Sequence, residues 1–166
     1  MSGVSFRVSA DDAKVRAALM EVLSLGHDAA PIMQEIATYG ENSTLERFDS
    51  ETGPDGKKWK KSLRAQITGG KTLTDKGHLR GSITSDSGRD FAQWGSNKVY
   101  ARIQQLGGVI KPKTASKLRF KLANGGWRTV SQVTLPARPY LGVSHEDEVE
   151  ILAIIRSRLM GAAHAG

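Results

Sequence analysis

Apolar and polar residues alternate at the start of the chain, and apolar residues then recur at helical spacing. The alternation of Val4, Phe6 and Val8 with polar neighbours predicts a short strand. Helical spacing predicts one amphipathic helix over residues 9–26 and a second over 28–48, where Pro31 fits the first turn. Charged residues of the second helix are expected on a face that is wet or meets another subunit: Glu35, Glu41, Glu46 and Arg47.

The middle of the chain has the pattern of short strands joined by turns. Residues 79–84 and 90–95 predict one hairpin. Residues 117–121 and 127–133 predict another, because Asn124-Gly125-Gly126 supplies the positive φ angles of a tight turn. Residues 99–103 fit either a strand or a short helix, which Gly107 and Gly108 would end.

A stiff segment, residues 135–147, joins the last strand-like run to the last helix and is called the strap below. Pro136 and Pro139 fix their own φ and favour extended geometry in the residue before each. Ser144 and Asp147 resemble a capping box, with Asp in the Glu position, and predict a helix start. The apolar stripe of this helix is expected at Val149, Leu152, Ala153, Ile155 or Ile154, Leu159 and Met160.

The order of these elements predicts an α+β fold. We expect a curved antiparallel β-sheet with two N-terminal helices, one C-terminal helix, and a protruding loop and hairpin. The 166 residues fit a single domain, 1–166, in which 49–78 form an extended basic loop and 109–134 a basic β-hairpin arm. Trp59 is expected to dock onto its own core or onto a partner, and so to hold the loop in place.

The net charge of +7 is concentrated in two segments. From Lys57 to Arg80 there are eight Lys or Arg and one acid, and from Lys111 to Arg128 there are six and none. These segments contribute +7 and +6, so the remainder of the chain carries −6. Three interpretations stay open: solvated loops, complementary patches through which identical subunits stack, and proximity to nucleic acid.

Several kinds of chemistry lack their sequence signals. No apolar run is long enough to cross a bilayer, no export signal is recognisable at the N-terminus, and no cysteine is present. Gly69-Gly70-Lys71-Thr72 resembles the end of a phosphate-binding loop, but Ala65 stands where its first glycine belongs. The four histidines are widely separated, and residues 142–146 lack the closing glycine of a nucleophile elbow. We expect no enzyme, no cofactor and no metal site.

Four stretches resemble, in order and spacing, the phage virion morphogenesis family, which includes the G protein of Mu-like phages and tail completion proteins. The resemblance runs from about Gly53 to the C-terminus. This chain departs from the family pattern at Gln104-Gln105, where His-Gln is common, and at Asp75-Lys76-Gly77, which replaces a tighter turn. The four stretches are Pro54-x-Gly56-x-x-Trp59-x-x-Ser62-Leu63, Leu73-Thr74-Asp75-x-Gly77-x-Leu79-Arg80-x-Ser82-Ile83, Tyr100-Ala101-x-Ile103-Gln104-Gln105-x-Gly107-Gly108 and Leu135-Pro136-Ala137-Arg138-Pro139-Tyr140-Leu141-Gly142.

The resemblance implies a structural virion protein, a tail completion or tail terminator protein. Such a protein would form a homo-oligomeric ring, expected to be a hexamer, at the head-proximal end of the tail. Its partners would be the phage tail tube protein and head–tail connector proteins, in the virion tail or neck after assembly in the host cytoplasm. Two alternatives stay open: a head-side assembly or connector factor of the same family, and a non-specific DNA-binding module close to genomic DNA.

Residue type and placement give eight candidates for interfaces with other subunits or partners. Replacing Arg138 or Tyr140 by alanine is expected to damage folding or assembly. The candidates are Trp59, Arg80, Tyr100, Gln104, Arg119, Trp127, Arg138 and Tyr140.

Overall fold

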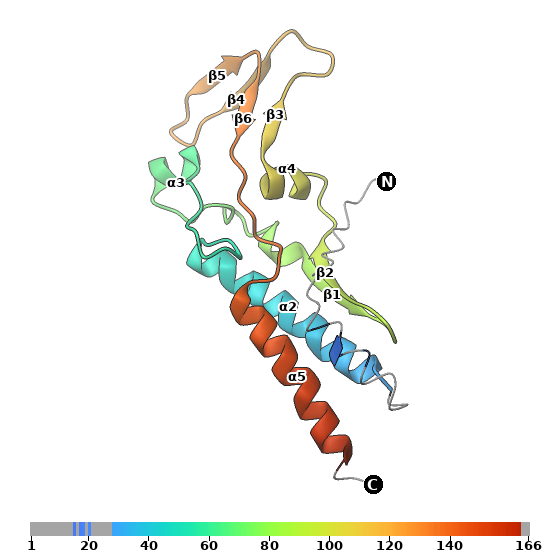
Figure 1. Cartoon of the computed structure of the whole chain (residues 1–166). Helices are drawn as coiled ribbons and strands as arrows, with labels where there is room; N and C mark the ends of the chain where they lie inside the picture. The colour runs from blue at the N-terminus through green and yellow to red at the C-terminus, as the bar shows by residue number, and fades with distance from the viewer. Residues whose placement is uncertain (1–14, 16, 19, 21–27, 164–166) are drawn as a thin grey trace.

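The computed structural model describes residues 15, 17, 18, 20 and 28–163 (Figure 1). The four described residues before position 28 are helical, and Val15 and Ala18 pack against the core. The strand predicted at Val4, Phe6 and Val8 lies outside the described residues, as does most of the helix predicted over 9–26.

The described part of the chain is a mixture of helices and short antiparallel strands, which confirms the α+β class. Its helices are α2 (Ala30–Ser50), α3 (Leu63–Thr68), α4 (Ala101–Leu106) and α5 (His145–Ala163), with a 3-10 turn at Arg80–Ser82. Its strands are β1 (Ile83–Ser87), β2 (Ala92–Ser96), β3 (Gly108–Ile110), β4 (Leu118–Lys121), β5 (Trp127–Val130) and β6 (Val133–Leu135).

The strands form three separate pairs, β1–β2, β3–β6 and β4–β5, in place of the one curved sheet expected from the sequence. The β1–β2 pair packs along α2, and the other two pairs lie beyond α4 (Figure 1). Both predicted hairpins are confirmed: Ile83 pairs with Ser96 in the first, and Leu118 with Val130 in the second. Residues 99–103, which fitted strand or helix, belong largely to α4.

Helices α2 and α5 lie side by side and run in opposite directions, while residues 108–135 project away from them (Figure 1). We call residues 108–135 the arm; it contains the β3–β6 and β4–β5 pairs. The loop over 49–78 was expected to be extended, but it contains the short helix α3. The hydroxyl of Ser62 caps α3 by accepting a hydrogen bond from the Ala65 N–H at 3.2 Å.

The core has two clusters of buried apolar side chains. The first joins α2 to α5, and the second gathers the centre of the molecule around Phe48 and Tyr140, whose rings are 5.2 Å apart. Phe48 also meets Trp59 edge to face at 5.6 Å. The second cluster therefore joins α2, the 49–78 loop and the strap, three parts that are distant in sequence.

Gly40 in the middle of α2 is a packing requirement. From sequence Gly40 is only a residue within a predicted helix, yet the indole of Trp94 on β2 covers this glycine. A Cβ built at position 40 would lie 2.5 Å from two atoms of the Trp94 ring. Glycine therefore lets β1–β2 approach α2 closely.

Arg47, which was expected on the wet face of α2, is buried. Its guanidinium donates to the carbonyl oxygens of Tyr140 at 3.2 Å and Gly142 at 2.8 Å, and pairs with the carboxylate of Asp147. The helical period alone could not reveal this, because the acceptors of Arg47 are about a hundred residues away in the sequence.

Asp147 is the point where α2, the strap and α5 meet. The predicted capping box is confirmed, since the Asp147 N–H donates to the Ser144 hydroxyl at 3.2 Å and the Ser144 N–H donates to the Asp147 carboxylate at 2.6 Å. The hydroxyls of Ser43 and Tyr39 donate to the same carboxylate at 2.6 and 3.1 Å. Burial raises the pKa of Asp147, but these hydrogen bonds and the charge of Arg47 outweigh burial and hold that pKa below its usual value.

This attachment also sets the rotation of α5 about its axis. Because Asp147 faces α2, the residues four, seven and eight positions later face α2 as well. Those residues are Ile151, Ile154 and Ile155, all buried. The expected stripe was therefore only partly right: Ile154, Ile155 and Leu159 pack against the core, whereas Val149 is 55% exposed.

The Gly40 contact predicts that Gly40→Ala lowers the free energy of unfolding by about 1–3 kcal/mol, because the methyl group must displace Trp94. Alanine is the better helix former by about 1 kcal/mol, so a net loss would identify the clash as the dominant effect. Gly81→Ala is the matched control, since its Cβ would meet nothing within 4 Å. Denaturant unfolding measures both; equal stability of the two variants would contradict the packing argument.

The Asp147 network predicts acid sensitivity of a defined sign. The folded pKa lies below the unfolded value of about 3.9, so the ionised carboxylate stabilises the fold above about pH 4 and this contribution is lost as pH falls through the folded pKa. Asp147→Asn should cost about 3–5 kcal/mol at neutral pH, since it leaves Arg47 buried without its counter-charge. It should also flatten the acid limb of a stability-against-pH curve. Asp90→Asn, at an exposed carboxylate without a hydrogen bond or ion pair in the described structure, should leave that limb unchanged.

Candidate functional site

The strap crosses the molecule and is held by side chains of three other elements. The side-chain oxygen of Gln105 on α4 accepts hydrogen bonds from the N–H groups of Tyr140 at 2.9 Å and Leu141 at 3.0 Å, and its Nε2 donates to the Leu141 carbonyl at 2.8 Å. The indole N–H of Trp59 donates to the Pro139 carbonyl at 2.8 Å. Trp59 and Tyr140 are thus core residues of this subunit, so Trp59 docks onto its own core.

Arg138, another candidate from the sequence, is also buried and ties the 49–78 loop to the strap. Its Nε donates to the Lys60 carbonyl at 2.8 Å, and its backbone N–H donates to the Gln104 carbonyl at 2.9 Å. Burial lowers the pKa of this guanidinium. Arg138 therefore fixes the spacing between residue 60 and α4, which border the cavity described next.

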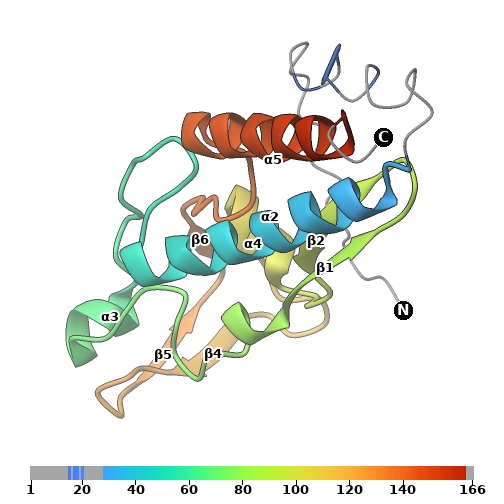
Figure 2. The ribbon, with the colours of Figure 1, turned by 90° about the horizontal axis from the view of Figure 1, so that it is seen from below.

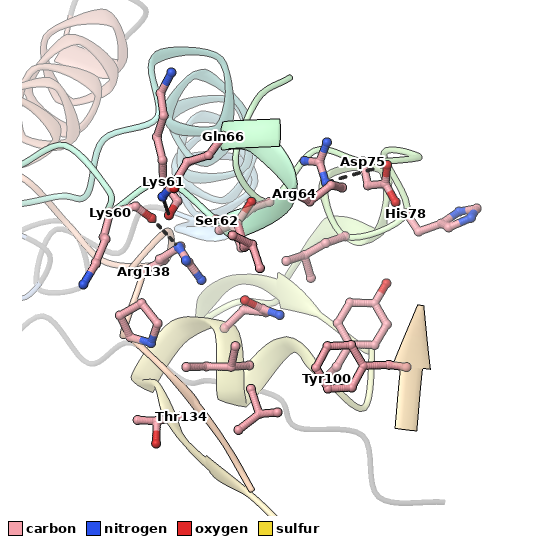
Figure 3. A pocket seen from close by; sticks show the side chains of 18 of the residues that line it. Lys60, Lys61, Ser62, Arg64, Gln66, Asp75, His78, Tyr100, Thr134 and Arg138 are labelled. Carbon is pink, nitrogen blue, oxygen red and sulfur yellow. Dashed lines mark hydrogen bonds and ion pairs between the residues drawn. The ribbon is translucent and has the colours of Figure 1, made fainter. Parts of the chain in front are cut away.

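An open groove of about 800 Å³ lies between the 49–78 loop, α4 and the arm (Figure 3). One wall comes from Lys60 to Arg64 and from Leu73 to Leu79, and the floor includes Tyr100 and Gln104 of α4. The other wall comes from the arm and the beginning of the strap, including Phe120, Arg128 and residues 130–136. This one cavity is thus lined by four basic residues of the first segment, Lys60, Lys61, Arg64 and Lys76, and by Arg128 of the second.

The groove is strongly basic and also apolar. Six Lys or Arg residues line it against the single acid Asp75, whose carboxylate is 3.7 Å from Arg64 Nε. Lys60, Lys61, Lys76 and Arg128 are exposed there. Leu63 and Tyr100, respectively 50% and 39% exposed, add apolar surface. This combination suits a partner that presents acidic and apolar side chains together.

Three other candidates from the sequence lie elsewhere. Arg80 does not line the groove; it donates to the carboxylate of Asp49 at 2.9 Å, at the end of α2. Arg119 and Trp127 lie on the opposite face of the β4–β5 hairpin from Phe120 and Arg128, because neighbouring residues of a strand point to opposite sides. There the Arg119 guanidinium stacks 4.6 Å from the centre of the exposed Trp127 ring.

Exposed apolar side chains also continue from the end of α4 into the arm. Leu106 and Val109 are each 51% exposed, Ile110 is 37% exposed and Trp127 is 61% exposed. β3 has no buried residue along its length. This surface is available to another subunit or partner.

Residues 69–72, which resemble the end of a phosphate-binding loop, are hydrogen-bonded to other parts of the subunit. The Thr72 N–H donates to the Glu51 carboxylate at 2.6 Å, and Arg64 donates to the Lys71 carbonyl. Among the residues that the structure describes, no cluster of three or more potential metal ligands occurs. In the same part of the chain no helix is long and apolar enough to span a membrane.

Comparison with known proteins places the chain among phage assembly proteins. It is 31% identical to "Putative capsid assembly protein G" of Escherichia phage Mu, over 96% of this chain and 97% of the relative. It is also 31% identical to "Mu-like prophage FluMu G protein 2" of Haemophilus influenzae, over 86% of this chain and 87% of that protein. No solved structure matches the chain. The model of the phage virion morphogenesis family matches residues 10–160, so the chain belongs to that family.

Proposed function

We propose that this chain is a tail completion protein that forms a ring at the head-proximal end of a phage tail and joins the tail to the head connector. Family membership gives it a structural or assembly role in the phage particle. The proposal adds two features to this role: a ring, expected to be a hexamer, and a position in the tail or neck. The tail tube protein and head–tail connector proteins are the proposed partners, met in the host cytoplasm during assembly.

The observation that carries the proposal is that the subunit has two unlike surfaces. Basic residues from both basic segments line one groove beside the arm, whereas exposed glutamates such as Glu46 and Glu150 lie on α2 and α5. A closed ring needs a heterologous contact, in which one face of each subunit meets a different face of the next. Opposite charges on the two faces favour that arrangement and oppose face-to-face pairing of like surfaces.

The arm supports the same proposal. Its strand pairs are three and four residues long, and isolated two-stranded pairs are marginally stable in water. Val109, Ile110 and Trp127 nevertheless stay exposed on it. Burial of these side chains against a neighbour would stabilise both the arm and the ring.

A head-side assembly factor is the second candidate, because the relative from phage Mu is named for capsid assembly. Particles made without this chain distinguish the two candidates. Loss of a tail completion protein should leave filled heads and separate, unjoined tails in electron micrographs. Loss of a head-side factor should instead leave few or aberrant heads with normal tails, and that result would overturn the proposal.

The arm predicts a defect in self-association. Val109→Asp with Ile110→Asp should weaken ring formation at least about tenfold, because two charges replace apolar contacts of about 1–3 kcal/mol. Sedimentation velocity over a range of concentrations measures the effect. Val99→Asp, at a residue that is 81% exposed and outside the arm, is the control for adding charge. A wild-type chain that stays monomeric at high concentration and alongside tail and neck proteins would contradict the ring itself.

A further inference from the structure

The basic and apolar lining of the groove suits one kind of binding partner. We propose that it receives an acidic patch of a second copy of this chain, formed by Glu46 of α2 and by Glu146, Val149 and Glu150 of α5. This inference rests on the proposed ring and names the contact that would close it. It also gives a role to four exposed basic residues of the groove that form no ion pair within the described residues: Lys60, Lys61, Lys76 and Arg128.

No Lys or Arg of the described residues forms an ion pair with the acidic patch. Two other acids are paired, Glu35 with Arg158 and Asp49 with Arg80, whereas the exposed Asp86 and Asp90 also lack an ion pair in the described structure. Glu46 and Glu150 have no such ion pair within the described residues, and both are exposed.

The two glutamates are close to one another although they belong to different helices. They flank the buried pair of Arg47 and Asp147 that joins α2 to α5. Glu46 directly precedes Arg47 on α2, and Glu150 lies about one helical turn after Asp147 on α5. Glu146 lies four positions before Glu150, and Val149 lies directly before it. Both are on the exposed side of α5. The patch therefore presents three carboxylates around a valine that is 55% exposed.

The chemistry of the groove matches that patch. Lys60 and Arg128 face the cavity from its two walls, and Lys61 and Lys76 add two further ammonium groups without an ion pair in the described structure. Leu63, Tyr100 and Phe120 line it between these charges and offer an apolar surface to Val149.

The two surfaces also lie on opposite sides of the subunit. In Figure 2, α5 lies on one side of α2, and α3 with the β4–β5 hairpin lies on the other. A subunit therefore cannot fill its own groove with its own acidic patch. A next copy can do so, and repetition of this contact gives a head-to-tail series that closes into a ring.

Nucleic acid is a poorer match for this cavity. Two of its guanidiniums are already engaged, Arg64 with Asp75 and Lys71, and Arg138 with the Lys60 carbonyl. Leucine and phenylalanine side chains occupy much of the remaining lining. Phosphate binding relies on free Lys and Arg and gains nothing from buried aliphatic surface.

Charge reversal tests the contact. Lys60→Glu with Arg128→Glu reverses the groove, and Glu46→Lys with Glu150→Lys reverses the patch; all four side chains are exposed, so folding should be preserved. Each double variant should associate at least about tenfold more weakly than the wild type in sedimentation velocity. The variant that carries all four changes should recover association, as should an equimolar mixture of the two double variants. Arg89→Glu with Arg156→Glu makes the same charge change at exposed residues outside the groove, the arm and the acidic patch, and should assemble like the wild type.

The outcomes separate this inference from the proposed function. If the wild type forms a ring and the groove-reversed variant forms it equally well, the proposed contact is wrong but the ring is not. The proposed contact is also wrong if the four-change variant does not recover association although its circular dichroism and melting temperature match those of the wild type. Loss of duplex DNA binding on groove reversal, with unchanged association, would assign the groove to nucleic acid instead. A wild-type chain that never self-associates would overturn both the contact and the ring.

Discussion

The buried ion pair between Arg47 and Asp147 is the interaction on which the arrangement of this subunit depends. It joins the end of α2 to the first turn of α5, and Arg47 also holds the strap through the carbonyls of Tyr140 and Gly142. A buried charge is tolerated only when it is paired and hydrogen-bonded, and both groups here meet that condition. The pair therefore fixes the position of the strap and the rotation of α5 about its axis, in addition to any contribution to the free energy of unfolding.

That choice has consequences at both ends of the molecule. At one end, the strap fixed by Arg47 carries Arg138, which holds the 49–78 loop at Lys60 and so fixes one wall of the groove relative to α4. At the other end, the rotation of α5 buries Ile151 and Ile155 and leaves Val149 and Glu150 outward. The basic groove and the acidic patch are thus consequences of the same buried network.

Much of the fold could be predicted from the sequence, because local rules decide it. The spacing of Ile32 and Ile36, the Asn124-Gly125-Gly126 turn and the Ser144–Asp147 capping box each specify their own element. What could not be predicted depends on contacts between distant segments: the burial of Arg47, the packing of Trp94 on Gly40, and the separation of the strands into three pairs. The same holds for the site. Charge counts located both basic segments, but only the fold shows which of their residues line one cavity, and Gln105 was visible only as part of a family motif.

Burial also divides the eight interface candidates by role. Trp59, Arg138 and Tyr140 act within the subunit, whereas Tyr100, Arg119 and Trp127 remain accessible. Large aromatic and arginine side chains suit both roles, and sequence alone does not distinguish them.

The central claim is that unlike surfaces of identical subunits interlock, and the most direct test is a cryo-EM reconstruction of the assembled protein at the head–tail junction. The account predicts that each groove contains the first turns of α5 from the adjacent copy. Grooves that face the lumen and contact DNA, or copies that meet through two identical faces, would contradict it.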